Sequence, residues 1–158
     1  DKSEKIFSIR DAVLKIEKLY NEKSSFIFDL DVTSPLRNVL DIKKAFNIFK
    51  NNKLDNLFSV NKSRKNPYFN MIEISKNKVV KKIKNINSKT VVRRQDAPKV
   101  YDMNASIYIW KRKFFFNIED ILLKKTIIYE MPEERSIDVD TKFDLKIVKF
   151  LMENNDEI

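Results

Sequence analysis

The stretch "FIFDLDVTSPLRNVLDIKKAFNIFKNNKLDNLFSV", residues 26–60, decides the expected fold. It begins with a short apolar run rich in β-forming residues, which is typical of a buried strand. After the polar turn "TSP" (33–35), apolar residues recur along one side of a helical pattern at 38–52. A second apolar run at 55–60 predicts another buried strand. The succession of strand, helix and strand indicates an α/β fold with a parallel sheet and crossover helices.

Both flanks extend this pattern into one domain. Residues 6–20 form an amphipathic helical pattern before the first strand. The elements expected after residue 60 are an antiparallel pair at 68–74 and 78–86, strands at 105–110 and 126–131, a short helix at 113–125 and a final helix at about 142–153. We therefore expect an antiparallel excursion from the main sheet at roughly 66–125.

Composition narrows the possible chemistry. The 158 residues include no cysteine and no histidine, which excludes disulfides, Cys-ligated zinc and a histidine general base. Any catalysis therefore depends on carboxylates, lysine, arginine, tyrosine, hydroxyls, the backbone or a bound metal. No apolar run reaches the roughly 18 residues of a membrane span, and the first residues show no signal-peptide pattern. These features predict a cytoplasmic protein with no membrane partner.

The net charge of +9 allows three interpretations. A basic surface suits nucleic acid or a small polyanionic substrate, and a composition biased toward lysine and asparagine explains the charge equally well. Acidic residues are mixed in throughout, and the densest basic stretch, at 76–89, interleaves lysine with valine and isoleucine as an exposed hairpin does. The aromatic residues fall mainly on expected core positions, so we expect no nucleic-acid partner.

The stretch "SIDVDTKFDL" (136–145) carries two carboxylates, Asp138 and Asp140, separated by one valine. In a strand these alternate side chains share a face, where they repel each other unless a cation lies between them. Mg²⁺ suits such a pair, because it is commonly held by one or two carboxylates together with water and substrate phosphates. The alternative is that Asp140 or Thr141 caps the final helix.

Three motifs carry a family resemblance. They are "TSPLR" (33–37), "RQDAPKVYDMNASIYI" (94–109) and "SIDVDT" (136–141), and their order and spacing resemble those of the acylneuraminate cytidylyltransferases, the CMP-sialic acid synthetases and their bacterial relatives. The match begins about a third of the way into the family, after its Gly-rich nucleotide-binding loop. The chain has no glycine, against an average of about 7%. We therefore expect residues 1–158 to be the C-terminal two-thirds of one cytidylyltransferase domain.

The resemblance implies a fold and a reaction. The fold is a three-layer α/β nucleotidyltransferase with a mixed sheet, a homodimer through the antiparallel excursion. The anomeric hydroxyl of a nonulosonic acid (sialic, legionaminic or pseudaminic) attacks the α-phosphate of CTP, pyrophosphate leaves and a CMP-sugar forms. Without the Gly-rich loop the isolated chain is expected to be inactive, with an apolar sheet edge exposed beside residues 26–32. The alternatives are a remnant that only dimerises and a basic nucleic-acid-binding module.

The same resemblance implies site residues. Asp138 and Asp140 match the family's metal-binding pair, which implies Mg²⁺ and a catalytic role. Arg94 matches an arginine beside the anionic sugar. Asn104 and Tyr108 match polar groups that line the sugar pocket. The alternative is a surface ion pair for Arg94 and a core position for Tyr108.

Further positions carry weaker signals. Gln95 is expected to line the sugar pocket, and Arg37 to brace the turn that follows Pro35. Asp31 stands where the family commonly has a glutamine that faces the sugar. Other departures are Phe69 or Asn70 in place of a lysine and Ala105 in place of a glycine. These changes favour a modified bacterial nonulosonate, most of all a legionaminic-type sugar.

Overall fold

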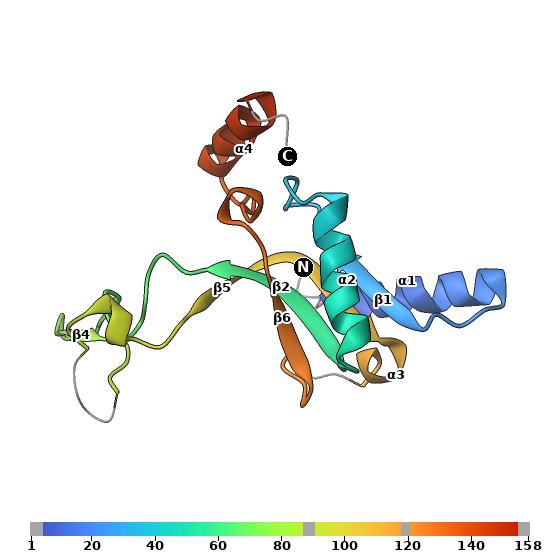
Figure 1. The fold of residues 1–158 in the computed structure, drawn as a ribbon, viewed down its shortest axis with the longest axis horizontal. Helices are drawn as coiled ribbons and strands as arrows, with labels where there is room; N and C mark the ends of the chain where they lie inside the picture. The colour runs from blue at the N-terminus through green and yellow to red at the C-terminus, as the bar shows by residue number, and fades with distance from the viewer. Residues whose placement is uncertain (1–4, 87–90, 118–120, 155–158) are drawn as a thin grey trace. The chain divides into compact units, whose positions relative to one another are not determined.

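The computed structural model describes residues 5–86, 91–117 and 121–154, which form two compact units (Figure 1). The first unit comprises Asp1–Val60 and Met103–Ile158, and the second comprises Asn61–Asp102. The excursion expected at 66–125 therefore overlaps the second unit, but its last part lies in the first.

A four-stranded sheet forms the centre of the first unit. Its strands are β1 (Phe26–Leu30), β5 (Tyr101–Lys111), β2 (Asn56–Lys62) and β6 (Thr126–Glu130), in that order across the sheet. Strand β1 is antiparallel to β5, and β2 is parallel to β6. Contacts of Lys111 with Asp55 and of Ile107 with Ser59 show that β5 and β2 are antiparallel. The sheet is mixed, as the family resemblance implies.

The arrangement of β1 and β2 differs from the expectation drawn from residues 26–60. Both strands form and run in the same direction, but β5 lies between them. The expected parallel sheet is therefore present only in part, because β2 pairs in parallel with β6 whereas β1 pairs antiparallel with β5. Strand β1 is an edge of the sheet, and its alternate residues Phe26, Phe28 and Leu30 are each more than a third exposed, although the rings of Phe26 and Phe28 contact Phe46. An exposed apolar edge on this side was expected.

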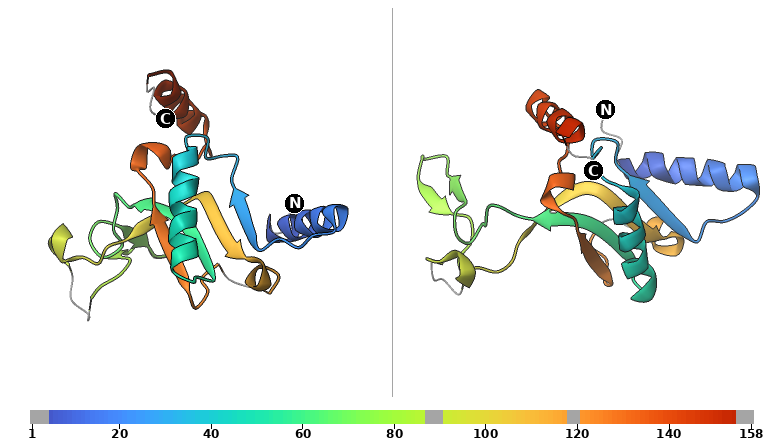
Figure 2. Two further views of the ribbon diagram at one scale, coloured as in Figure 1. Left: turned by 45° about the vertical axis from the view of Figure 1, so that its right-hand side comes forward. Right: turned by 45° about the horizontal axis from the view of Figure 1, so that its top comes forward.

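Helices cover both faces of the sheet (Figure 2). On one face α2 (Val39–Asn51) packs Ala45 and Phe49 against Ile107 and Ile109 of β5. Neighbouring residues of a strand point to opposite faces. On the other face α1 (Lys5–Tyr20) and α3 (Arg112–Phe115) therefore meet the alternate strand residues. The apolar cluster there contains Ile6, Ile9, Val13, Ile27, Trp110 and Phe115.

One local prediction is wrong where the structure describes it. Of the helix expected at 113–125, residues 118–120 lie outside the described residues, and the described part is helical only in α3, because Phe115 is fully buried against Trp110 and the chain then turns. Residues 121–125 form a turn that Thr126 stabilises, since its hydroxyl group bonds Leu123. The shared face considered for Asp138 and Asp140 assumed a strand at 136–140, and the structure has no strand there. Strand β6 ends at Glu130, and a short 3₁₀ helix, η2 (Glu133–Arg135), follows.

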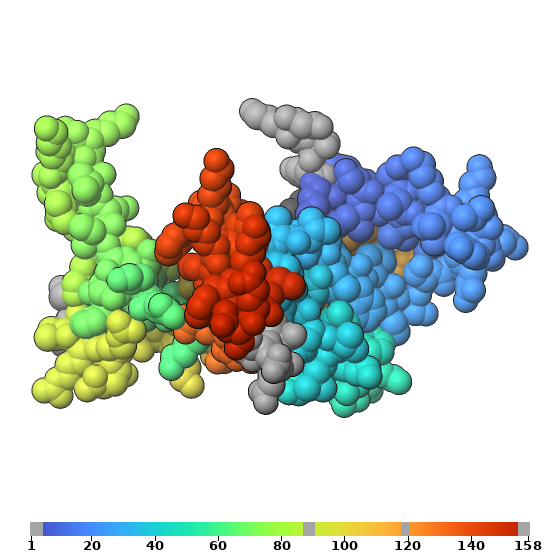
Figure 3. Space-filling model, turned by 90° about the horizontal axis from the view of Figure 1, so that it is seen from above, coloured from blue at the N-terminus to red at the C-terminus, as the bar shows by residue number. Residues whose placement is uncertain are grey.

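The last helix, α4 (Lys142–Asn154), lies on the surface of the first unit (Figure 3). Val148 on its inner side is buried, whereas Phe143 and Phe150 are exposed. The helix begins as expected. No helix among the described residues is long and apolar enough to span a membrane.

The second unit contains the expected antiparallel pair in a shorter form. Strands β3 (Ile72–Ile74) and β4 (Val80–Lys82) pair in antiparallel register, with Glu73 opposite Lys81. A 3₁₀ helix, η1 (Arg94–Asp96), follows. The next strand, β5, starts at Tyr101, four residues before the predicted position.

Residues other than glycine take the left-handed backbone positions of this glycine-free chain. Asn21, Lys53, Lys78 and Ala105 have φ values of 50°, 50°, 60° and 52°. Asn21 and Lys53 follow the ends of α1 and α2, where glycine is common. Asparagine tolerates this conformation better than alanine does. Ala105, inside β5, is therefore a strained position, and it stands where the family resemblance places a glycine.

Candidate active site

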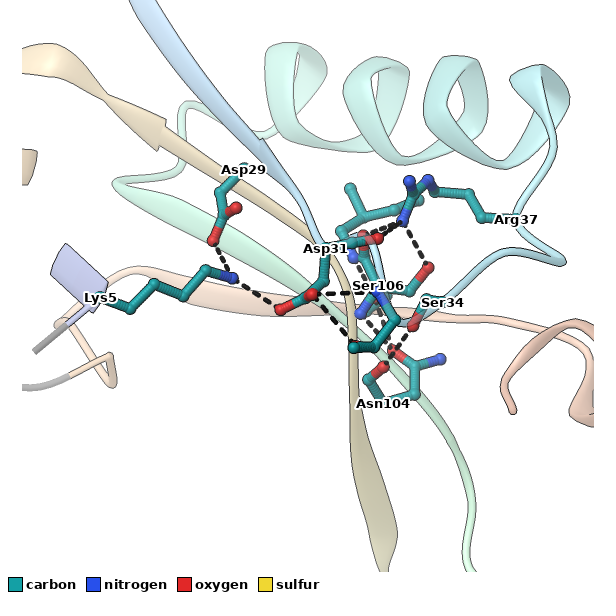
Figure 4. Close-up of polar contacts among 10 residues, drawn as sticks. Lys5, Asp29, Asp31, Ser34, Arg37, Asn104 and Ser106 are labelled. Carbon is teal, nitrogen blue, oxygen red and sulfur yellow. Dashed lines mark hydrogen bonds and ion pairs between the residues drawn. The ribbon is translucent and has the colours of Figure 1, made fainter. Parts of the chain in front are cut away.

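Three charged side chains meet at the edge of the sheet where β1 ends (Figure 4). Asp29 and Asp31 alternate along the chain and so share a face. Lys5 Nζ, at the first turn of α1, lies 2.7 Å from Asp29 Oδ2 and 2.8 Å from Asp31 Oδ2. The lysine thus bridges two carboxylates, and it anchors the start of α1 beside the sheet.

The charges of this cluster support one another. The hydrogen bond from Lys5 holds the pKa of Asp31 below its usual value, and bonds from Thr33 add to the effect. Burial works against the charge of Lys5, but its bonds to both carboxylates outweigh burial and raise its pKa. One ammonium group serves two carboxylates and contacts one oxygen of each. Asp29 and Asp31 can therefore accept further hydrogen bonds.

Tyr108 lies directly opposite Asp29 in the register of β1 and β5. Its ring stacks on Trp110 at 5.4 Å, and the Lys5 ammonium lies 5.7 Å from the ring centroid. Burial raises the pKa of Tyr108, and the charges of Asp29, Asp31 and Asp138 raise it further against the opposing charge of Lys5. The phenol therefore stays protonated at neutral pH and can donate a hydrogen bond.

The charge of Asp138 contributes to the raised pKa of Tyr108. Its Oδ1 is buried and has no hydrogen-bond partner among the described residues, a property that it shares there only with the indole nitrogen of Trp110. Asp140 is exposed to solvent. A buried carboxylate oxygen without a partner is costly. Asp138 thus retains an acceptor that suits a cation.

The cap of α4 is Thr141. The Thr141 amide donates to Asp144 Oδ2 at 2.7 Å, and the Asp144 amide donates to Thr141 Oγ1 at 3.2 Å. These two bonds form a reciprocal cap of the first turn. Asp140 does not cap the helix, so of the two capping residues considered, Thr141 is the one observed.

Asn104 forms the centre of a buried polar network beneath this cluster. Its Oδ1 accepts from Ser59 Oγ at 2.7 Å and from the Ser106 amide at 3.3 Å. Its Nδ2 donates to Ser136 Oγ at 3.0 Å, and its carbonyl accepts from Ser34 Oγ at 3.2 Å. The side chain is only 5% exposed. Asn104 therefore holds together the three segments that carry the family motifs.

Arg37 braces the turn after Pro35, as expected. Its Nη1 donates to the carbonyl oxygens of Asp31 at 3.1 Å and of Ser106 at 2.7 Å. Burial lowers its pKa. The guanidinium thus fixes the backbone of Asp31 to β5.

Arg94 and Gln95 belong to the second unit. They line a pocket of about 220 Å³ together with Lys62, Ser63, Asn66, Ala97, Pro98, Lys99, Val100 and Tyr101. The Arg94 guanidinium lies 5.8 Å from the ring centroid of Phe69 and donates to the carbonyl of Arg64. Asn70 accepts from the amide of Asn66 and closes the 66–70 turn. The pocket is basic, which suits an anionic group.

Of the residues predicted from sequence, Asp31 and Asp138 both act by their charge on Tyr108, and the buried Asn104 bonds Ser34, Ser59 and Ser136. Lys5 and Asp29 were not predicted. A signal for Asp29 was present, because "DLD" at 29–31 has the same spacing as "DVD" at 138–140. Nothing in the sequence pairs Lys5 with either carboxylate.

Known proteins resemble this chain over almost its whole length. It is 44% identical over 152 residues to a Campylobacter jejuni protein named CMP-N,N'-diacetyllegionaminic acid synthase. Proteins named N-acylneuraminate cytidylyltransferase are among its more distant matches. It is also 43% identical over 152 residues to "post-translational flagellin modification protein B" of Campylobacter coli. Each match covers 96% of this chain and 63% of the other protein, so the chain spans less than two thirds of these relatives' length.

More distant comparisons agree. An N-acylneuraminate cytidylyltransferase of Streptococcus agalactiae is 29% identical over 125 residues, which cover 79% of this chain and 29% of that protein. No family model matches the sequence. The crystal structure of 4-diphosphocytidyl-2C-methyl-D-erythritol synthase from Anaerococcus prevotii aligns with a TM-score of 0.61 at 11% identity, over 96% of this chain and 68% of that one. This likeness shows the nucleotidyltransferase fold.

Proposed function

We propose that the protein, as encoded in its organism, transfers CMP from CTP to a nonulosonic acid. The anomeric hydroxyl oxygen bonds to the α-phosphorus, the bond from that phosphorus to the bridging oxygen breaks, and pyrophosphate leaves while the hydroxyl proton is lost. The observation that carries the proposal is the 44% identity over 152 residues to a CMP-N,N'-diacetyllegionaminic acid synthase. A legionaminic-type sugar is accordingly the proposed acceptor.

We assign Asp138 and Asp140 to a divalent metal, proposed to be Mg²⁺. The unpartnered buried Oδ1 of Asp138 fits this role, since a hard cation supplies what that oxygen lacks. Among the described residues no group of three or more metal-ligating side chains exists, which suits an ion that also relies on water and phosphate oxygens. When bound, such an ion neutralises phosphate charge.

The chain's own residues orient the sugar in this proposal. The protonated Tyr108 donates a hydrogen bond to a sugar oxygen, and Asp31 accepts one from a sugar hydroxyl or amide. Asn104 holds the backbone beneath them through its buried bonds. Arg94 binds the sugar carboxylate and Gln95 donates beside it, which the basic pocket of the second unit supports.

The proposed homodimer uses the β3–β4 hairpin of the second unit. Its apolar residues Ile72, Ile74, Val79 and Val80 are each more than half exposed. Light scattering after size exclusion tests the assembly. Ile74→Lys should shift a dimer toward monomer, while Lys76→Gln, on the same hairpin, should not.

Pyrophosphate release from CTP, Mg²⁺ and a nonulosonate tests the reaction. Asp138→Asn should lower kcat by on the order of 100-fold, because it removes a negatively charged ligand of the divalent ion that would neutralise phosphate charge. Asp11→Asn is the matched control, since Asp11 is an exposed carboxylate of α1 paired with Lys15. Full turnover by Asp138→Asn would reject the metal assignment. A wild-type protein that dimerises but never consumes CTP would favour the remnant hypothesis.

Sugar choice needs its own comparison. The kcat/KM for a 5,7-diamino nonulosonate should exceed that for N-acetylneuraminate, since this ratio measures differential binding of the transition state. Asp31→Gln, which installs the residue common in the family, should narrow the ratio. Equal values for the two sugars in the wild type would contradict the choice of a legionaminic-type acceptor.

We further propose that residues 1–158 alone do not turn over CTP. The sequence contains no glycine and hence no Gly-rich loop to supply backbone amides to a triphosphate. The same assay on the purified 158-residue chain tests this, and turnover comparable to that of a full-length relative would contradict it. A cytoplasmic location remains a prediction of the sequence.

A further inference from the structure

Asp41 is a fully buried carboxylate that the sequence motifs do not single out. Arg135 binds it through two bonds, from Nε to Oδ2 at 2.9 Å and from Nη2 to Oδ1 at 3.0 Å. Tyr129 donates its hydroxyl to Oδ1 at 2.9 Å, and the Asn38 amide donates to Oδ2 at 3.2 Å. Each of the two oxygens therefore accepts two hydrogen bonds, and the carboxylate has one fixed orientation.

The electrostatics keep this group ionised. Burial opposes the charge of Asp41, but the bonds from Arg135, Asn38 and Tyr129 outweigh it and lower the pKa of Asp41. Burial and the bond to Asp41 raise the pKa of Tyr129 to about 12. The bond to Asp41 raises the pKa of Arg135. The ion pair is thus intact across the neutral pH range.

Arg135 is the last residue of η2 and precedes the segment that carries Asp138. This segment has no strand ladder to fix it. Ser136 accepts the bond from Asn104, and the Val139 amide donates to the carbonyl of Thr33 at 2.9 Å. The backbone on both sides of Asp138 is therefore held by contacts, at Arg135 and Ser136 before it and at Val139 after it.

Asp41 also fixes the opposite side of the site. It is the third residue of α2 and forms a reciprocal cap with Asn38. Asn38 directly follows the turn in which Arg37 holds the backbone of Asp31. One carboxylate therefore ties the Asp31 turn to the Asp138 segment.

We propose that the Asp41–Arg135 pair is a positioning device that sets the place of the Asp138 carboxylate relative to Asp31 and Tyr108. Arg135 and Asp41 act through the backbone and do not touch substrate. The catalytic consequence rests on the proposed function. The positional consequence does not, because it concerns only how residues 136–139 are held.

The test substitutes Arg135→Lys, which keeps the charge but removes the two-pronged geometry. Hydrogen exchange should show at least tenfold faster exchange of the Val139 amide, beyond any change at the amides of β5. The matched control is Arg112→Lys. Arg112 makes the equivalent two-pronged pair with Glu17, at 2.7 Å for each bond, and lies at the far end of β5. This control should also lose thermal stability, by less than Arg135→Lys does, and should not show the selective change at Val139.

Activity gives the second readout. In the protein as encoded, Arg135→Lys should lower kcat at least tenfold with KM for CTP changed less than threefold, and Mn²⁺ binding in the presence of CTP should weaken. Arg112→Lys should leave all three near the wild-type values. If Arg135→Lys unfolds the chain, Tyr129→Phe removes one bond to Asp41 and should produce smaller changes in the same direction.

Two results separate the hypotheses. Unchanged Val139 exchange in both Arg135→Lys and Tyr129→Phe, relative to Arg112→Lys, overturns the positioning role whatever the activity. A wild-type protein that forms no pyrophosphate with any nonulosonate overturns the proposed function, while faster Val139 exchange in Arg135→Lys still supports the positioning role.

Discussion

Two arginine–carboxylate pairs of nearly the same geometry lie at opposite ends of the first unit. Glu17 of α1 binds Arg112 at 2.7 Å for each bond, across 95 residues of sequence. Asp41 of α2 binds Arg135 at 2.9 and 3.0 Å, across 94 residues. What differs is the chain that follows each arginine. Aromatic residues that fill the core follow Arg112, whereas the segment of Asp138 follows Arg135.

The surroundings of the two carboxylates differ as well. Glu17 is 8% exposed and accepts one further bond, from the Ser24 amide. Asp41 is not exposed at all and accepts bonds from Tyr129 and Asn38 in addition. The same pairing thus closes α1 onto α3 in one place and holds a candidate catalytic segment in the other. The location of an ion pair, more than its geometry, decides what it contributes.

The largest expected effect is on stability at the Asp41 pair. Arg135→Gln should lower the free energy of unfolding by about 3 kcal/mol, because it leaves a buried carboxylate without its countercharge. Arg112→Gln should lower it less, since Glu17 keeps some contact with solvent. Urea unfolding at pH 7 measures both. An equal or reversed order would show that burial does not distinguish the two pairs.

Acid should affect the Glu17 pair in a defined range. The bond from Arg112 holds the pKa of Glu17 at about 2, below its usual value of 4.5. Because the folded pKa is the lower one, the stabilisation is complete above about pH 4.5 and is lost as the pH falls toward 2. Glu17→Gln should remove this part of the pH dependence. Thermal unfolding between pH 2 and pH 6 tests it, and an unchanged slope in the variant would contradict the assignment.

Ala105→Gly should raise stability by about 1 kcal/mol, because it relieves a left-handed alanine beside the buried network. The Glu17 region offers the control. Asn21 has a φ of 50° there, and asparagine tolerates this conformation, so Asn21→Gly should gain less. Denaturant midpoints compare the two variants. A larger gain at Asn21 would mean that the strain does not lie on the side of the candidate site.

The smallest stability change is expected at Lys5, whose side chain is 51% exposed. Lys5→Met should cost less than about 1 kcal/mol, as exposed ion pairs do. Its clearer effect should be a rise in the pKa of Asp31, since Lys5 is the main cause that lowers it. Titration of the Asp31 carboxyl by NMR measures the change. An unchanged pKa would show that the ion pair does not persist in solution.

Much of the local structure was predictable. Helices at 5–20, 39–51 and 142–154 lie within one or two residues of their predicted bounds, because apolar spacing and caps are properties of near neighbours. The failures have a common cause. Among the described residues, the helix predicted at 113–125 stops at Phe115, which enters the core, and the shared face considered for Asp138 and Asp140 needs a strand at 136–140, which has no partner strand. In both cases distant residues override a local preference.

The candidate site likewise has some features that the sequence shows and others that depend on tertiary packing. The spacing of Asp138 and Asp140, and the motif that contains Arg37, are visible in the chain itself. The unpartnered oxygen of Asp138 and the contact of Lys5 with Asp29 depend on how segments far apart are packed.

The sequence by itself determined the chemistry that the protein has at its disposal. Without histidine or cysteine, it relies on carboxylates, arginine, lysine and tyrosine, and the motif order relates it to a family. Tertiary structure decided which hydrogen-bond and ion-pair partners each carboxylate has. Asp41 was bound on every side, Asp31 was paired with Lys5, and Asp138 kept a buried oxygen without a partner. The reason is physical, since the state of a charge depends on its burial and on its neighbours in space, which spacing along the chain does not specify.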